Sequence, residues 1–315
     1  MNEPLNIAEW VQNESYRGHF IFTRQDIDRV FPLLSPTRIV QALWELSERG
    51  ILYSPWQNFY IIVPNEYRLK GVVPPVFFID QLMHFLGRPY YIGLLNAGAF
   101  YGAAHQRPQT FSCIVGGGSI RSISRKGITM LFHHKANMPM EFTQQFKTQM
   151  GYVNVSSPCL TALDLILFEQ EIGGLSRAAT VLAELTPELH FAEQPAELLR
   201  CFNAPIIQRL GYILECVLEE QQSADELYAL AKIANMSFRK VRLKISKPET
   251  DQLNRRWKII DNQPIEIDDI INMADKMQDD EFLNDTEHFL RFGDTFDPQA
   301  AYELVREKLI DRLQK

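Results

Sequence analysis

The chain has 315 residues, of which 46% are hydrophobic and 23% are charged, and its formal net charge is −7. This length allows about two or three domains with real hydrophobic cores, and the composition is that of a globular rather than a disordered protein. A negative total charge argues against a surface coated with cations for nucleic acid, although an average over several domains hides local fields. The sequence has no apolar run of membrane-spanning length and no secretory pattern at its amino terminus, so we expect a cytoplasmic protein.

The cysteines do not form a recognisable metal or disulfide pattern. They are far apart, with no C-x-x-C pair and no histidine couple at ligand spacing, at Cys113, Cys159, Cys201 and Cys216. We therefore expect reduced, mostly buried thiols, and no metal ion or cofactor.

The segment SPTRIVQALWELSERGIL, residues 35–52, predicts a helix with a defined start and end. Ser35 can cap its first turn, Pro36 fits the first helical position, and Gly50 follows the last turn. A buried stripe recurs at helical spacing and consists of Ile39, Ala42, Leu43 and Leu46. The other side is polar, as a solvated face or a binding face would be, and carries Thr37, Arg38, Gln41, Glu45 and Glu48.

The flanking segments indicate what kind of module contains this helix. Residues 5–13 predict a short helix, and a second one begins after Thr23 and is ended by Pro32. The β-prone runs ILYS and NFYIIVP follow the third helix, and SPWQ between them is a hairpin signal with a proline-containing turn. This order predicts a winged helix-turn-helix over residues 1–70.

In such a module, the third helix offers its amino-terminal half to the DNA major groove and the hairpin tip contacts the backbone or minor groove. Arg38 suits guanine and Gln41 suits adenine, so they are the candidate base readers, while Ser35 and Thr37 are candidates for phosphate contacts. The expected wing tip consists of Trp56, Gln57 and Asn58. The alternative is that this helix only packs against the core or binds another protein. The net charge of −1 for residues 1–70 supports this alternative, since the module has no excess of positive charge for DNA.

Residues 71–261 predict a second domain that mixes strands and helices. Helical patterning covers residues 77–86 and 92–102, and strands are expected at TFSCIV, ITMLFHH and GYVNVS. Ser157 and Pro158 open the apolar helix CLTALDLILF, and further helices follow. We therefore expect a multidomain α+β protein, with an α/β and helical domain between the winged helix and an acidic helical extension over residues 262–315.

Several patterns in this domain resemble parts of catalytic or binding sites without completing one. The three glycines in CIVGGGSIRSISRKG lack phosphate-loop spacing and precede a strand, although Arg121, Arg125 and Lys126 give the loop a basic tip. His133 and His134 point to opposite faces of a strand. Asp164 and Glu169 do not share a helix face and have no nearby lysine in sequence. We expect no catalytic residues and no enzyme.

Residues 239–258 are the strongest charge feature, with a net charge of +6, and they precede residues 259–315 with a net charge of −9. The cations partly alternate with apolar residues, as in a strand with one basic face, and are Arg239, Lys240, Arg242, Lys244, Lys247, Arg255, Arg256 and Lys258. Such a block can neutralise phosphates or can bind the acidic tail. Both interactions can occur if the acidic tail and nucleic acid compete for the same cations.

Three ordered segments resemble the AbiEi family, the antitoxin and transcriptional-regulator half of type IV toxin-antitoxin (abortive infection, or phage-defence) systems. They are YYIGLLNAGAFYGAAHQRPQTFSCIV, SSPCLTALDLILFEQEIGGLSRAATVLAEL and IIQRLGYILE, and the similarity spans roughly residues 10–260. The resemblance implies an autorepressor that binds its own promoter through the winged helix. It also implies an antitoxin that opposes a nucleotidyltransferase-like toxin, generally without a stable complex. The alternative is an antitoxin that neutralises its toxin by direct binding.

Overall fold

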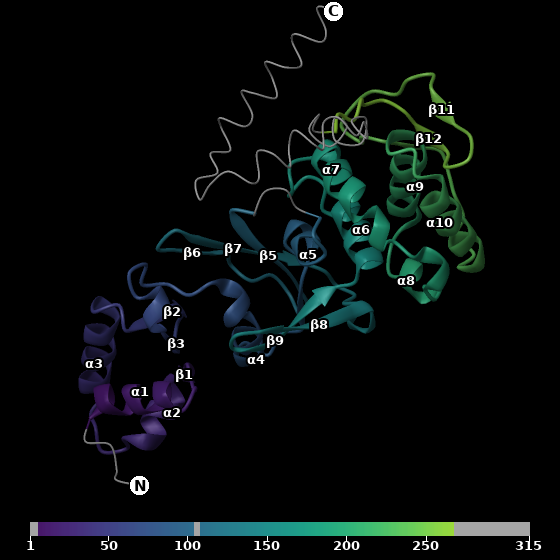
Figure 1. Cartoon of the computed structure of the whole chain (residues 1–315). Coiled ribbons are helices and arrows are strands. Elements are labelled where there is room, and N and C mark those ends of the chain that lie inside the picture. Colours follow the sequence, from purple (N-terminus) through teal and green to yellow (C-terminus); the bar gives the residue numbers. More distant parts are fainter. Residues whose placement is uncertain (1–5, 104–107, 268–315) are drawn as a thin grey trace, which may run out of the picture. The chain divides into compact units, whose positions relative to one another are not determined.

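The structure, a computed structural model, describes residues 6–103 and 108–267 (Figure 1). Within these ranges the chain is a mixed α+β protein with three separate sheets. The described residues up to Glu266 belong to one compact unit. Most of the expected acidic extension, residues 268–315, lies outside the described residues.

The amino-terminal part combines three helices with a three-stranded antiparallel sheet of order β1-β3-β2. Its elements in chain order are α1 (Ile7–Tyr16), β1 (Ile21–Thr23), α2 (Arg24–Val30), α3 (Pro36–Glu48), β2 (Leu52–Trp56) and β3 (Phe59–Ile62). Three residues of the predicted stripe on α3, Ile39, Leu43 and Leu46, are buried in one core, whereas Ala42 is half-buried. The helical periodicity of this segment is therefore confirmed.

The helix starts follow the capping chemistry of the sequence. The Thr23 side chain accepts from the backbone N–H of Asp26, whose carboxylate accepts from the Thr23 N–H at 2.8 Å, which closes a capping box. Ser35 Oγ accepts from the Arg38 N–H at 3.4 Å, with Pro36 at the first helical position. These contacts fix where α2 and α3 begin.

The β2–β3 hairpin turns later than the sequence indicated. The expected turn SPWQ is wrong, because Pro55 and Trp56 belong to β2 and the turn lies at Gln57 and Asn58. Asn58 has a positive φ of 64°, a conformation that asparagine tolerates better than most residues. The register shifts between Tyr53 and Trp56, and this irregularity accommodates a proline within a strand.

The second part is built on a six-stranded mixed sheet of order β6-β7-β5-β4-β9-β8. Its strands are β4 (Tyr90–Ile92), β5 (Thr110–Val115), β6 (Ile123–Arg125), β7 (Ile128–His134), β8 (Thr143–Thr148) and β9 (Gly151–Ser156). The predicted strands TFSCIV, ITMLFHH and GYVNVS are confirmed as β5, β7 and β9. In this sheet β5 runs parallel to β7 and β4 runs parallel to β9, while the other pairs are antiparallel.

Helices pack against this sheet and against one another (Figure 1). They are α4 (Ile79–Phe85), α5 (Leu94–Phe100), α6 (Pro158–Leu167), α7 (Leu175–Leu185), α8 (Glu197–Arg200), α9 (Ala204–Tyr212) and α10 (Gln221–Ile233). α6 is central to this arrangement, since it contacts α5, α7 and α9. Its predicted cap is confirmed, because Ser157 Oγ accepts from the Leu160 N–H.

A small third sheet of order β10-β12-β11 closes the described part of the chain. Its strands are β10 (Val241–Arg242), β11 (Leu253–Asn254) and β12 (Ile259–Ile260). The expected longer strand with one basic face is therefore reduced to two residues of regular strand. Trp257 anchors this sheet, because its fully buried ring packs edge-on against Tyr228 with centroids 5.3 Å apart.

The β2–β3 hairpin connects the two larger parts through its side chains. Residues of β3 face different cores: Ile62 packs with α1 and α3, whereas Phe59 and Ile61 share a core with Phe78 and Leu82. The hairpin is thus fixed on both faces. Whether residues 1–70 make a domain of their own stays a prediction.

Candidate nucleic-acid interface

The amino-terminal half of α3 presents the polar side chains that the sequence singled out. Ser35, Thr37, Arg38 and Gln41 are all exposed on the side opposite the buried stripe. Arg38 has no carboxylate partner among the described residues, while Gln41 Nε2 donates to Glu45 Oε1 at 3.0 Å. Arg38 and Gln41 lie three positions apart, so both side chains can approach one surface in front of the helix.

Apolar side chains share this exposed face of α3. Val40 is 56% exposed and Trp44 is 61% exposed, and Leu33, just before the helix, is 98% exposed. Such groups can contact thymine methyl groups in a major groove, or the apolar surface of another protein. The face is therefore suited to binding rather than only to solvation.

The predicted wing-tip residues are separated by the actual turn. Gln57 and Asn58 are exposed at the tip of the β2–β3 hairpin, whereas Trp56 is half-buried as the last residue of β2. The Asn58 carbonyl accepts from the Arg24 N–H at 2.9 Å, which holds the tip near the start of α2. Gln57 and the Asn58 side chain remain available for an outside partner.

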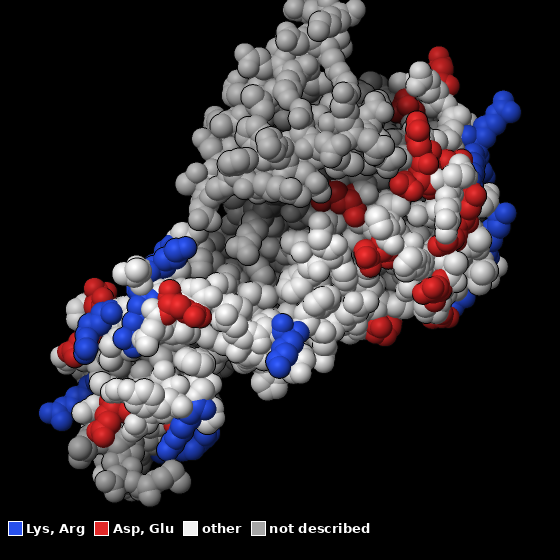
Figure 2. Space-filling model, in the orientation of Figure 1, with Lys and Arg blue, Asp and Glu red and all other residues white. Residues whose placement is uncertain are grey.

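Charges on the amino-terminal elements are mixed. On the face shown in Figure 2, Lys and Arg over this part of the molecule are interspersed with Asp and Glu. Two arginines of α2 are neutralised within the helix, Arg24 by Asp28 at 2.9 Å and Arg29 by Asp26 at 3.3 Å. Arg38 is the cation that the first half of α3 offers to solvent.

The basic block at residues 239–258 is partly neutralised by nearby carboxylates. Lys244 Nζ lies 2.7 Å from Glu169 Oε1, and Lys240 Nζ lies 3.8 Å from Glu249. Arg256 pairs with Glu215 at 3.3 Å and with Asp225 at 2.6 Å. These ion pairs reduce the charge that the block can offer to phosphates.

The remaining cations of the block divide into two groups. Arg242 donates to the Lys247 carbonyl and Lys258 donates to the Phe238 carbonyl, both at 3.1 Å, so they stabilise the local fold. Arg239, Lys247 and Arg255 are exposed and have no carboxylate partner in the described parts of the chain. Only part of the positive charge of the block is therefore left without a carboxylate partner in the described residues.

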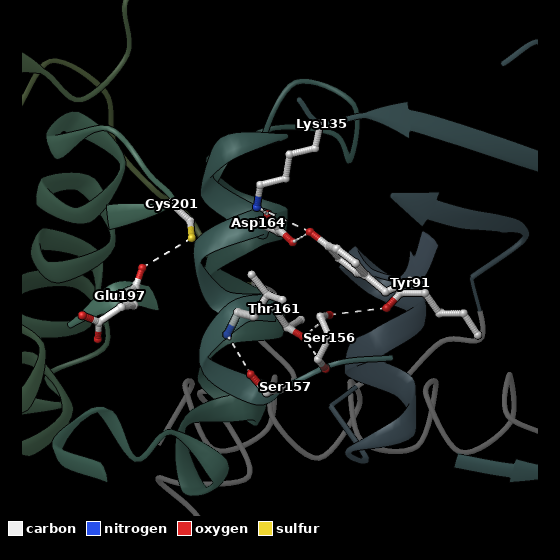
Figure 3. Close-up of polar contacts among 10 residues, drawn as sticks. Tyr91, Lys135, Ser156, Ser157, Thr161, Asp164, Glu197 and Cys201 are labelled. Atoms are coloured by element: carbon white, nitrogen blue, oxygen red, sulfur yellow. Dashed lines mark hydrogen bonds and ion pairs between the residues drawn. The ribbon is translucent and has the colours of Figure 1, made fainter. Parts of the chain in front are cut away.

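A buried polar cluster lies at the centre of the second part (Figure 3). It joins Tyr91 of β4, Lys135 just after β7 and Asp164 of α6. Lys135 Nζ and Tyr91 Oη each lie 2.7 Å from a different Asp164 oxygen, and the Lys135 ammonium also lies 3.9 Å from the centre of the Phe202 ring. Asp164 is fully buried and Lys135 is 7% exposed. The cluster ties α6 to the sheet.

Burial dominates the protonation behaviour of this cluster. It raises the pKa of the Asp164 carboxyl, an effect that the Lys135 ammonium and the Tyr91 hydroxyl oppose. Burial also raises the pKa of the Tyr91 hydroxyl and the pKa of the nearby Cys201 thiol, so neither forms an anion readily. A separate buried hydrogen bond joins Ser156 Oγ and Thr161 Oγ1, which lie 2.7 Å apart.

Sequence reasoning missed this cluster because its members are far apart in the chain. Asp164 has a lysine partner after all, but Lys135 precedes it by 29 residues. A lysine directly after the apolar strand ITMLFHH, and an aspartate inside an apolar helix, were the available signals.

No three His, Cys, Asp or Glu side chains are grouped to hold a metal ion within residues 6–103 and 108–267. Among the same residues, no helix is long and apolar enough to cross a membrane.

Comparisons with known proteins find a family match within the second part of the chain. Residues 91–216 match the family model described as the AbiEi antitoxin C-terminal domain. The RV2827C protein from Mycobacterium tuberculosis is similar in structure, with a TM-score of 0.59 and 11% identity over 80% of this chain and 89% of that chain. At this identity the similarity shows a shared fold alone.

A second solved structure, an antigenic nucleotidyltransferase-like protein from Paracoccidioides brasiliensis, matches 50% of this chain and 92% of its own with 12% identity. Its TM-score of 0.31 is too low to support an argument about fold or function. No curated protein matches the chain.

The residues that match the AbiEi family model, 91–216, run from β4 past α9 and contain the whole Tyr91–Lys135–Asp164 cluster. These residues therefore match an AbiEi antitoxin C-terminal domain, and this match supports an AbiEi-family antitoxin.

Proposed function

We propose that the protein is the antitoxin of a type IV toxin-antitoxin system and represses its own operon by binding promoter DNA. The observation that carries the DNA-binding part is α3, whose exposed Ser35, Thr37, Arg38 and Gln41 precede a hairpin in a module joined to an AbiEi antitoxin domain. The protein would have three parts, a winged helix over residues 1–70, an antitoxin domain over 71–261 and an acidic extension over 262–315.

The order of elements supports a winged helix. The chain runs helix, strand, helix, helix, strand, strand, and the sheet has the order β1-β3-β2. In this arrangement α3 is the recognition helix and the β2–β3 hairpin, which we call the wing, lies beside it.

The side chains on α3 suggest how the protein would recognise DNA bases. Arg38 would donate two hydrogen bonds to guanine O6 and N7, and Gln41 would pair with adenine N6 and N7, after release from Glu45. Ser35 and Thr37 would contact phosphates, as would Gln57 and Asn58 at the wing tip. Each good bidentate contact discriminates against a wrong base by about 1 to 3 kcal/mol.

A mobility-shift assay on the DNA upstream of the gene, against scrambled DNA of equal length at two salt concentrations, tests this proposal. We expect the wild type to prefer upstream DNA and the Arg38→Ala/Gln41→Ala variant to lose that preference. Arg49→Ala, which removes a cation after the other end of α3, is the matched control and should keep the preference. Equally weakened binding to both DNAs would make Arg38 and Gln41 backbone contacts instead of base readers.

The antitoxin part is tested separately in cells. Co-expression with the neighbouring nucleotidyltransferase-like toxin should restore growth, and the Arg38→Ala/Gln41→Ala variant should restore it equally under a foreign promoter. A tagged antitoxin should not retain the untagged toxin through purification. Stable co-purification would favour the alternative, in which the antitoxin neutralises its toxin by direct binding.

A further inference from the structure

The segment from just before β6 to the β6–β7 turn carries three cations that the proposed winged helix does not include. Arg121, Arg125 and Lys126 are all exposed. None of them has a carboxylate partner within the described parts of the chain, in contrast to Lys244 and Arg256. Their charges are therefore available to an anionic partner.

These cations lie directly beside the wing. The Arg125 guanidinium donates to the Ser54 carbonyl of β2, and the Arg121 guanidinium lies 4.9 Å from the centre of the Trp56 ring. A cavity of about 520 Å³ is lined by wing residues, including Gln57 and Asn58, and by residues 121–125. The basic segment is thus fixed next to the wing tip.

The same segment also borders the recognition helix. A second cavity, of about 470 Å³, is lined by Trp44 and Glu48 of α3, by Tyr53 and Tyr60 of the hairpin, and by Arg125 and Lys126. A duplex bound along α3 and the wing would therefore pass close to these cations.

The wing lacks the charge that DNA binding requires. Residues 52–62 contain no lysine or arginine, and the first half of α3 contributes only Arg38. Phosphate neutralisation by cations supplies a large share of protein–DNA affinity. A second source of positive charge next to the wing would fill this deficit.

We propose that Arg121, Arg125 and Lys126 bind phosphates of the DNA duplex beside the wing, so that the antitoxin domain forms part of the DNA interface. This inference rests on the proposed function. The contacts are to the backbone, so they strengthen binding to every sequence equally and make it dependent on salt.

Fluorescence anisotropy titrations of the full chain on upstream and scrambled duplexes, over a salt series, test the inference. The test variant is Arg125→Gln/Lys126→Gln. The control is Lys147→Gln/Arg177→Gln, which removes the same charge from two exposed cations, with Lys147 on β8 at the opposite edge of the sheet. Lys126→Gln alone is a second test variant, since the Lys126 side chain makes no hydrogen bond within the described residues.

We expect the test variant to weaken binding to both duplexes by the same factor, relative to the control. The slope of log affinity against log salt should decrease by about 0.9 for each phosphate that the variant no longer neutralises. Lys126→Gln alone should show part of both effects. Test and control variants with equal affinity and equal slope would overturn the inference, and so would weakening confined to upstream DNA.

If the proposed promoter recognition is wrong, the titrations give a result that differs from failure of the phosphate contacts. In that case the wild type would bind upstream and scrambled DNA equally, and Arg38→Ala/Gln41→Ala would change neither. The decrease in salt slope on scrambled DNA would then still support the phosphate contacts, and an unchanged slope would overturn them. A wild type that binds no DNA at any salt concentration would overturn both.

Discussion

At the residue scale, the ion pair between Lys135 and Asp164 is a buried contact that joins α6 to the sheet. Both side chains are buried, and the carboxylate is also bonded by the Tyr91 hydroxyl. Removal of one partner from a buried pair typically costs about 3 to 5 kcal/mol, because the other is left buried without compensation.

Lys135→Met should therefore lower the free energy of unfolding by about 3 to 5 kcal/mol, as measured by urea denaturation at neutral pH. The double variant Lys135→Met/Asp164→Leu should regain much of this stability, since it removes both charges. A Lys135→Met protein as stable as the wild type would contradict the assignment of this pair as the link between α6 and the sheet.

His133 gives the protein a pH-dependent stability. Its Nε2 is buried without a hydrogen-bond partner among the described residues, and burial lowers the pKa of the imidazole, an effect that Glu171 partly opposes. The unfolded chain then binds a proton at a higher pH than the folded chain does. The stabilisation from His133 is present above a pH of about 6.5 and is lost as the pH falls further.

We expect the wild type to lose more stability than His133→Leu between about pH 7 and about pH 5. Thermal unfolding midpoints of both proteins across this range measure the difference. The same pH dependence in both proteins would show that His133 does not control it.

At the element scale, Gly211 allows α9 to approach the small third sheet. A Cβ atom at this position would meet the Trp257 ring, whose side chain is fully buried, well inside van der Waals distance. Gln208, one turn earlier, holds the same segment by donating to the carbonyl oxygens of Trp257 and Arg239 at 2.6 and 2.7 Å.

Gly211→Ala should destabilise the protein by about 1 to 3 kcal/mol, the usual cost of overpacking, although alanine normally stabilises a helix interior relative to glycine. Chemical denaturation of the variant measures this effect. A gain in stability would show that the Trp257 ring can move aside.

The elements that could be predicted from sequence are those determined by neighbours in the chain. Caps and periodicity located α3 and α6, and the outward direction of Arg38 and Gln41 followed from the buried stripe of their helix. The hairpin turn was misplaced because Pro55 is accommodated within β2 by a register shift, whereas Asn58 adopts the positive φ of the turn. No local pattern marks such an irregularity.

The parts that could not be predicted depend on contacts between distant segments. The pairing of Lys135 with Asp164 and the contact of Arg121 with Trp56 join elements that periodicity treats separately. The basic block has the pattern of one charged strand face, but three carboxylates from outside the block neutralise part of it, namely Glu169, Glu215 and Asp225. Charge counts along a sequence cannot include such partners.

At the scale of the whole molecule, the net charge of −7 is concentrated at one end. Residues 268–315 contain thirteen Asp and Glu against six Lys and Arg, a net charge of −7, so residues 1–267 are formally neutral. The sequence-based hypothesis is that this acidic segment competes with nucleic acid for the cations of the chain.

Deletion of residues 268–315 should, on this hypothesis, strengthen binding to scrambled DNA, most clearly at low salt. Anisotropy titrations of the shortened and full-length proteins across a salt series measure the effect. Unchanged affinity at every salt concentration would remove the competition hypothesis.

The β2–β3 hairpin and the second part of the chain are also linked through a shared core. Phe59 and Ile61 of β3 pack with Phe78 and Leu82, so an isolated amino-terminal fragment would expose this apolar surface. DNA-binding experiments on this protein therefore require both parts in one chain.

The most direct test of the central claim, that α3 reads promoter DNA, is the ratio of dissociation constants for scrambled and upstream DNA at one salt concentration. Base reading by α3 predicts a ratio well above one for the wild type, and a decrease of about 10-fold or more for Arg38→Ala/Gln41→Ala, as expected from the removal of interactions worth about 1 to 3 kcal/mol each. A wild-type ratio of one, or a ratio unchanged by the variant, would contradict it and make α3 a packing or protein-binding helix.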